Sequence, residues 1–239
     1  MEIVILTAIG VGASTVIGAL LGFIFGKLSE HTGEVILAFG AGVMLWAAIL
    51  GLIIPSLKYG EWALVITPLG VILGGAVILL IDKLLPMLDG YFTVGCSDDP
   101  SEGEKRRSVL LFVLAIAVHN LPEGIASGVA FGTGNFGDAM LVSGSIALQN
   151  IPEGMVIISP MISIGITKRR ALIYAAFTGV VEVLGVLLGY YTVQISKMLL
   201  PLFLALAGGC MLFVIVDEMG KRNNRRLRRK SRRFSVLGL

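Results

Sequence analysis

The sequence contains few cysteines and few charged residues, and each shortage excludes a class of protein. Only two cysteines, Cys96 and Cys210, occur among the 239 residues, which excludes a disulfide framework and a paired-cysteine metal site. Charged side chains make up 15% of the chain, whereas a soluble domain carries about 25%. With 56% hydrophobic residues and a mean hydropathy of +0.90, the composition indicates a membrane protein.

What the chain does contain is a series of long apolar segments, each long enough to cross about 30 Å of hydrocarbon as a helix. The seven segments lie near residues 1–26, 35–57, 62–86, 109–131, 139–166, 171–193 and 198–217. We therefore expect an all-α, polytopic membrane helix bundle with seven transmembrane helices. A β-barrel is disfavoured because its strands alternate over segments of about ten residues. The first segment lacks a basic start and a clear cleavage site, which favours a retained helix over a signal peptide.

Positive charges are distributed unevenly between the two sides of this predicted bundle. With seven spans, 17 of the 19 Lys and Arg residues fall on the side of the C-terminal tail, and only Lys58 and Lys197 fall on the other. Cytoplasmic segments carry such an excess, so we expect the N-terminus outside and the tail in the cytoplasm. The predicted location is the plasma membrane, with a multi-pass transmembrane domain over residues 1–220.

Two polar segments are expected outside the bilayer. Residues 87–107, which include several Asp and Glu, are interpreted as a flexible cytoplasmic loop. Residues 221–239 form a tail with nine Lys and Arg between positions 221 and 233. Because this tail directly follows a membrane helix, we expect it to contact anionic lipid headgroups of the bilayer rather than nucleic acid. Whether the chain forms a homodimer is left open.

Two near-identical polar motifs interrupt the apolar segments. His-Asn-Leu-Pro-Glu-Gly occupies 119–124, and Gln-Asn-Ile-Pro-Glu-Gly occupies 149–154. A charge at the centre of a membrane helix costs roughly 3 kcal/mol, so its presence indicates function. The turn-rich link between the two helices centres on Asn135. At a rise of about 1.5 Å per residue, an antiparallel hairpin would bring both motifs to one depth near the bilayer midplane.

The polar side chains of each motif share one helix face, because residues three and four apart are neighbours. These side chains are His119, Asn120, Glu123, Gln149, Asn150 and Glu153. Pro122 and Pro152 each lack an N–H donor, which predicts kinked half-membrane helices that meet over a polar cluster. Glu182, in the middle of the sixth predicted helix, adds a third intramembrane carboxylate.

One imidazole, three carboxylates and three amides form a mixed set of nitrogen and oxygen ligands. Such a set suits Zn²⁺, Fe²⁺ or Mn²⁺ and argues against Cu(I), which prefers thiolates. Three carboxylates offset most of the charge of two divalent cations, so one or two metal positions are feasible. The alternative is a buried hydrogen-bond network without metal. In that case no intramembrane Lys or Arg would balance the negative charge of the three carboxylates.

The two motifs, together with Glu-x-Leu-Gly at 182–185, resemble the ZIP (Zrt/Irt-like) family of divalent metal transporters. Gln149 at the start of the second motif is similar to the GufA branch, and residues 40–56 are similar to the family's second helix. The resemblance covers about residues 1–220. It implies a 3+2+3 arrangement of eight helices, whereas here the basic tail follows the seventh helix. We therefore expect either that the eighth helix has been lost or that the sequence is truncated.

The resemblance also implies roles for the polar residues in a binuclear centre. One metal ion would be held by His119, Glu123, Gln149 and Glu153. A second ion would be held by Asn120, Asn150 and Glu182, with Glu123 and Glu153 able to bridge the two. The implied function is import of a divalent transition metal into the cytoplasm by alternating access. Zinc is the first candidate, and Fe²⁺, Mn²⁺ and Cd²⁺ are alternatives.

Two other functions stay open at this point. Without an eighth helix, the chain could be a metal-binding membrane protein that no longer transports. An intramembrane metalloenzyme is less well supported, because HExxH and the Glu-x-x-His pairs of di-iron bundles are absent from the sequence. We therefore expect no enzymatic activity and no catalytic cofactor.

Overall fold

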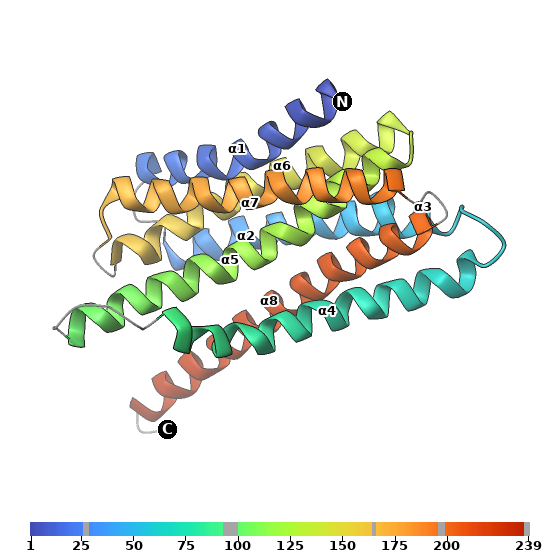
Figure 1. Ribbon diagram of the computed structural model, residues 1–239. Coiled ribbons are helices and arrows are strands. Elements are labelled where there is room, and N and C mark those ends of the chain that lie inside the picture. Colours follow the sequence, from blue (N-terminus) through green and yellow to red (C-terminus); the bar gives the residue numbers. More distant parts are fainter. Residues whose placement is uncertain (26–28, 93–99, 164–165, 196–198, 237–239) are drawn as a thin grey trace.

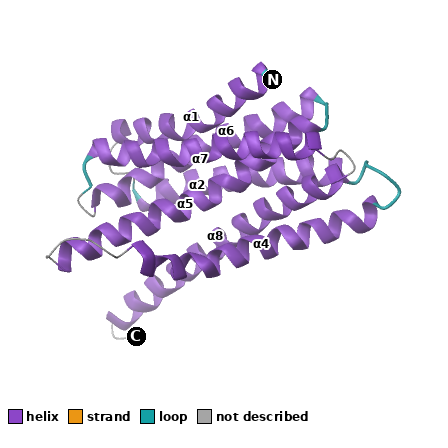
Figure 2. Cartoon of the chain, viewed as in Figure 1, coloured by secondary structure: helices purple, strands orange, loops and turns teal. Residues whose placement is uncertain are grey.

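Helices make up nearly all of the computed structural model, which describes residues 1–25, 29–92, 100–163, 166–195 and 199–236 (Figures 1 and 2). In chain order they are α1 (Glu2–Phe25), α2 (Glu30–Trp46), η1 (Ala47–Ile53), α3 (Ile54–Ser56), α4 (Ala63–Phe92), α5 (Pro100–Gly132), α6 (Phe136–Ser163), α7 (Lys168–Ile195) and α8 (Leu200–Val236). No strand occurs within these ranges. The predicted all-α class is confirmed.

The expected apolar segments fall on helices of membrane length. Within the described ranges, six helical segments are long and apolar enough to cross a membrane, judged by length and composition. These are Glu2–Phe25, His31–Ser56, Ala63–Ile81, Phe136–Ile158, Lys168–Ile195 and Leu200–Asp217. The remaining expected segment, residues 109–131, lies on α5. The chain is therefore a polytopic helical membrane protein.

The expected loop at residues 87–107 is helical on both of its flanks, which corrects that prediction. α4 continues to Phe92 and α5 begins at Pro100, while residues 93–99 lie outside the described part. A proline is favourable in the first turn of a helix because its missing N–H would have no partner there.

The last predicted span, near residues 198–217, falls within a longer helix. α8 runs on to Val236 and includes most of the basic tail. Arg and Lys are good helix formers, and their charge is favourable near a helix C-terminus. The polar tail therefore indicates where the apolar span ends, but the helix itself continues past that point.

The second span contains an irregularity that the sequence analysis did not predict. η1 is a seven-residue π-helix between α2 and α3, and Pro55 follows in α3. Proline cannot donate to the carbonyl one turn earlier, and a wider π turn is one way in which a helix accommodates such a defect. Gly51 in η1 packs so closely on α6 that a Cβ there would collide with the Val142 side chain.

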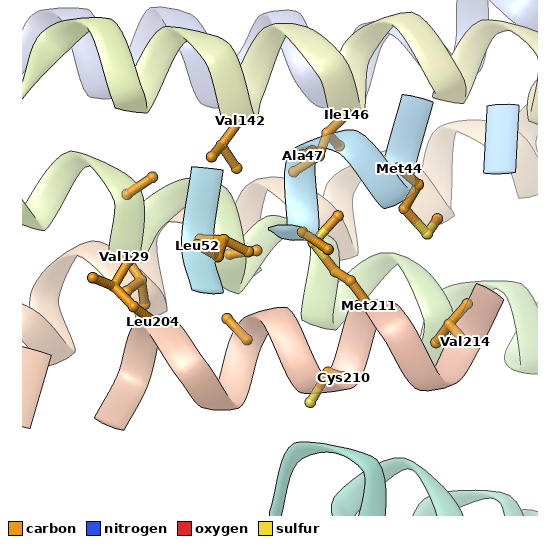
Figure 3. Packing of buried hydrophobic residues seen from close by; sticks show 14 of the residues in the cluster. Met44, Ala47, Leu52, Val129, Val142, Ile146, Leu204, Cys210, Met211 and Val214 are labelled. Atoms are coloured by element: carbon orange, nitrogen blue, oxygen red, sulfur yellow. The ribbon is translucent and has the colours of Figure 1, made fainter. Parts of the chain in front are cut away.

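The helices pack in two groups. α1, α5, α6 and α7 form one group, in which α5 packs on α7 and α1 on α6, and α4 and α8 form the other. α2 packs on α6, and η1 contacts both α6 and α8, so the second span lies between the groups. An apolar cluster fills this junction (Figure 3), with side chains that include Met44, Ala47, Leu52, Val129, Val142, Ile146, Leu204 and Met211.

Glycines allow the backbones of α1 and α6 to touch. A Cβ at Gly18 would collide with the carbonyl of Ile151. One turn later, a Cβ at Gly22 would lie 2.8 Å from the carbonyl oxygen of Met155. Close packing of this kind is how membrane helices associate in lipid. Both α1 glycines therefore pack within the chain, beside the second polar motif.

Glycines also allow the backbones of α5 and α7 to pack closely beside the first polar motif. A Cβ at Gly124 would collide with the carbonyl of Glu182, and one at Gly128 would collide with that of Val186. From the other side, a Cβ at Gly185 would lie 2.7 Å from the Leu121 carbonyl oxygen. Two glycine-lined helix pairs thus hold the motifs in place.

Candidate metal site

Asn135 directly precedes α6 and sets the register between α5 and α6. Its Oδ1 accepts from the backbone N–H groups of Gly137 at 2.9 Å and Asp138 at 3.4 Å, as an N-cap residue does. Ser127 and Ser143, each eight residues from Asn135, share a hydrogen bond of 2.6 Å. The antiparallel register expected from the turn is therefore present.

This register places the two polar motifs at the same depth. The Gln149 side chain on α6 donates from Nε2 to Oε2 of Glu123 on α5 at 2.6 Å. The same Nε2 lies 2.9 Å from Oδ1 of Asn150. Glu123 is 2% exposed and Gln149 is 4% exposed, so this carboxylate receives an amide donor away from solvent.

Asn150 connects the second motif to α7 and α1. Its Nδ2 lies 2.8 Å from both carboxylate oxygens of Glu182, and both residues are fully buried. The same Nδ2 lies 3.3 Å from the backbone carbonyl oxygen of Val11 on α1. Sequence analysis missed this contact with α1, because a backbone carbonyl has no signature in the sequence.

The other three expected site residues occupy different environments. Asn120 is fully buried, and neither its Oδ1 nor its Nδ2 has a hydrogen-bond partner. His119 and Glu153 are partly buried. Glu153 lies three residues after Asn150 on α6. All three lie on the helices that carry the hydrogen-bonded residues, within one turn of them.

Hydrogen bonds join four of the seven expected residues in the order Glu123, Gln149, Asn150, Glu182. Among the residues that the structure describes, no three His, Cys, Asp or Glu side chains are grouped closely enough to hold a metal ion. Carboxylates alternate here with amides, and an amide offers a carbonyl oxygen as well as N–H donors. A metal ion in this cluster would therefore need amide oxygens to complete its coordination.

α5 and α6 continue as helices through Pro122 and Pro152. The expected division into half-membrane helices is therefore wrong. A proline removes one hydrogen bond and does not have to end a helix when neighbouring helices support the freed carbonyl. Here the backbone of α7 lies against Gly124, directly after the first motif.

We expect Ser127→Ala or Ser143→Ala alone to lower the free energy of unfolding by about 0.5–1.5 kcal/mol, as for other hydrogen bonds between membrane helices. Each single change leaves one buried hydroxyl unpaired, since the two hydroxyls are 2.6 Å apart and at most 1% exposed. The double variant should lose less than the sum of the single losses. Unfolding of the four proteins in a double-mutant cycle measures this coupling, and strictly additive losses would contradict it.

Comparison with known proteins agrees with the resemblance seen in the motifs. A family model described as "ZIP Zinc transporter" matches residues 95–221. The zinc transporter GufA of Myxococcus xanthus is 33% identical over 218 residues, which cover 87% of this chain and 83% of that protein. The zinc transporter ZIPB of Bordetella bronchiseptica is 32% identical over 212 residues, covering 87% and 68%.

A third relative extends the agreement. The zinc transporter ZupT of an Enterobacter species is 29% identical over 221 residues, which cover 92% of this chain and 86% of the relative. All three relatives are named as transporters, and the region matched by the family model contains both polar motifs and Glu182. The expected resemblance, including that to GufA, is confirmed: this chain belongs to the ZIP family of zinc transporters.

Proposed function

We propose that this chain imports divalent transition-metal ions, zinc first, through the polar cluster on α5, α6 and α7. One observation carries the proposal: Glu123 and Glu182, at most 2% exposed, are linked through the amides of Gln149 and Asn150 inside apolar helices. Buried carboxylates are costly in a bilayer and are kept where an ion or proton passes. A divalent cation has the charge that these groups would neutralise.

The seven polar residues divide into two unequal positions in this proposal. The first ion position would use His119, Glu123, Gln149 and Glu153. The second would use Asn120, Asn150 and Glu182. The first contains an imidazole nitrogen, which suits Zn²⁺, whereas the second offers only oxygen ligands from its carboxylate and amides.

Binding would require the amides to change their partners. Gln149 now directs Nε2 at the Glu123 carboxylate, and a cation bound to that carboxylate repels an N–H donor. Rotation about the last side-chain bond would replace the donor with the carbonyl oxygen, which is a metal ligand. The same exchange at Asn150 would free Glu182 for the second position. The amides would thus stabilise the carboxylates by hydrogen bonding when no ion is bound, and ligate the ion when it arrives.

The packing of the helices supports alternating access by rocking of one helix group against another. All seven residues lie on α5, α6 and α7, within the group that also contains α1. The junction with α8 is formed by apolar side chains (Figure 3), and such a surface can shift without breaking polar contacts. Movement of the site with its own group would open it to one side of the membrane at a time.

The orientation of the chain in the membrane follows from the distribution of charge. The start of α7 and the C-terminal end of α8, both with Lys and Arg, lie at the end of the bundle away from the N-terminus (Figure 1). By the positive-inside rule this end faces the cytoplasm. We infer a plasma-membrane protein with its N-terminus outside, which releases the ion on the side of the basic tail.

Proteoliposomes that contain the purified chain and a trapped zinc-sensitive dye should show saturable Zn²⁺ influx. Added Fe²⁺, Mn²⁺ and Cd²⁺ should compete, since all accept imidazole and oxygen ligands. Protein-free liposomes and liposomes containing Glu61→Gln are the controls, because Glu61 is exposed and lies outside the spans. Stoichiometric Zn²⁺ binding by calorimetry without any influx would instead identify a metal-binding membrane protein that does not transport.

A further inference from the structure

Helix α1 reaches the polar cluster although it contributes no charged or amide side chain there. The Val11 carbonyl accepts from Asn150, and Gly12 packs against the backbone of Gly179, one turn before Glu182. A Cβ at Gly154 would collide with the carbonyl of Thr15. Residues 11–15 of α1 therefore lie between the second motif on α6 and the Glu182 turn of α7.

Thr15 is at the level of the Asn150 amide. In an α-helix the carbonyl oxygen of residue i lies beside the N–H of residue i+4. The Val11 oxygen that Asn150 contacts therefore lies next to the backbone of Thr15. The Thr15 side chain is fully buried, at 0% exposure, and its hydroxyl has no hydrogen-bond partner.

This orphaned hydroxyl is unusual for a threonine in a helix. Such a hydroxyl normally bonds a carbonyl three or four residues earlier, as Thr178 does to the Ala175 carbonyl oxygen at 2.9 Å. For Thr15 the carbonyl four residues earlier is that of Val11, which accepts instead from Ser14 and Asn150. Buried polar groups in folded proteins nearly always have partners, so the free hydroxyl points to a ligand.

Asn120 on α5 also has buried polar atoms without a hydrogen-bond partner. Within the described ranges, the buried side-chain nitrogen and oxygen atoms without a partner are the Thr15 hydroxyl and the two polar atoms of Asn120. A bare cation could satisfy the oxygens but not the Asn120 Nδ2, which is a donor. A water molecule both donates and accepts. A divalent cation in the cluster that retains part of its water would offer the Thr15 hydroxyl a hydrogen-bond partner.

We propose that Thr15 is a further specificity-determining residue of the ion site, whose hydroxyl hydrogen-bonds a water molecule retained by the bound divalent cation. This inference rests on the proposed function and adds α1 as a wall of the site. It also predicts selectivity. Mn²⁺ favours octahedral oxygen coordination, whereas Zn²⁺ is usually four-coordinate, so loss of the hydroxyl should weaken Mn²⁺ binding more than Zn²⁺ binding.

The test measures the Kd of Zn²⁺ and of Mn²⁺ by calorimetry on the purified full chain and its variants. Thr15→Val keeps the shape and removes the hydroxyl; it should weaken Mn²⁺ binding about tenfold, as loss of an outer-shell partner does, and Zn²⁺ binding by less. Thr15→Ser should restore the wild-type ratio of the two Kd values. Thr15→Ala replaces Thr15→Val if the valine variant does not fold.

Thr178→Val is the matched control, because it removes a buried hydroxyl that is already bonded within its own helix. Equal changes in Thr15→Val and Thr178→Val, or an unchanged ratio of Kd values in Thr15→Val, would overturn the inference. Glu123→Gln separates the two proposals. If Glu123→Gln abolishes ion binding while Thr15→Val changes neither Kd, the proposed ion site is supported and the proposed role of Thr15 is wrong. If Glu123→Gln binds both ions with wild-type affinity, the proposed ion site itself is wrong.

Discussion

Glu123→Gln is expected to abolish Zn²⁺ influx and to weaken Zn²⁺ binding by at least about 100-fold. Loss of an outer-shell partner of a metal ligand already costs 10–100-fold, and Glu123 is proposed as a direct and bridging ligand. Glutamine keeps the size of the side chain, and its carbonyl oxygen can still accept from the Gln149 amide that now lies 2.6 Å from the carboxylate. The variant should therefore fold, and its loss should reflect the missing charge. Influx into proteoliposomes and calorimetric Kd values measure both effects.

Glu153→Gln provides a graded comparison for this experiment. Glu153 is only partly buried but is proposed as the second bridging ligand, so influx should fall in this variant as well. Glu61→Gln removes an exposed carboxylate outside the spans and should leave influx unchanged. Wild-type influx in a folded Glu123→Gln protein would remove Glu123 from the ion pathway. A loss of the same size in Glu61→Gln would point to a general effect of charge on the assay.

Gly18→Ala should destabilise the protein by about 1–3 kcal/mol, which is the usual cost of overpacking, and should reduce zinc binding. The added methyl group would collide with the carbonyl of Ile151, so α1 and α6 must separate. Ile151 directly follows Asn150, whose amide bridges Glu182 and the Val11 carbonyl. A shift here therefore moves the polar cluster itself. Thermal unfolding in detergent and the Kd of Zn²⁺ report the two consequences.

Gly10→Ala is the matched control on the same helix. No atom lies within 4 Å of a Cβ built at Gly10, and alanine is favoured over glycine in a helix by up to about 1 kcal/mol. This variant should be as stable as the wild type or slightly more stable, with unchanged zinc affinity. If Gly18→Ala behaved like Gly10→Ala, the close approach of α1 and α6 would not be required for the fold.

The general architecture and the depth of the motifs could be predicted from the sequence, because both depend on local quantities. Hydropathy over about 20 residues locates the spans, and the fixed rise of a helix determines which residues meet across the turn at Asn135. The contact between Glu123 and Gln149 follows from that count. The turn itself is visible in the sequence because asparagine is a preferred N-cap residue.

Features that depend on packing between distant segments could not be predicted in this way. The contact between α1 and the Asn150 amide uses the backbone carbonyl of Val11. The Thr15 hydroxyl is unpaired because other side chains donate to that carbonyl. The π-helix η1 likewise reflects packing around Pro55. The ends of α4 and α8 were misplaced because hydropathy registers the border of the hydrocarbon, whereas a helix of polar residues can continue into water.

The residues that hold the helices together differ from the residues proposed to bind the ion, and this difference matters for redesign. Gly18, Gly124 and Gly154 touch neighbouring backbones, so a side chain at any of these positions changes the framework. Gln149 instead meets Glu123 through its side chain, and His119 lies four residues before Glu123 on α5. An engineer seeking a different ion preference should therefore vary His119 and Gln149 and keep the glycines fixed. In evolution, too, the metal preference of such a chain could change through substitutions at these two positions while the glycines stay the same.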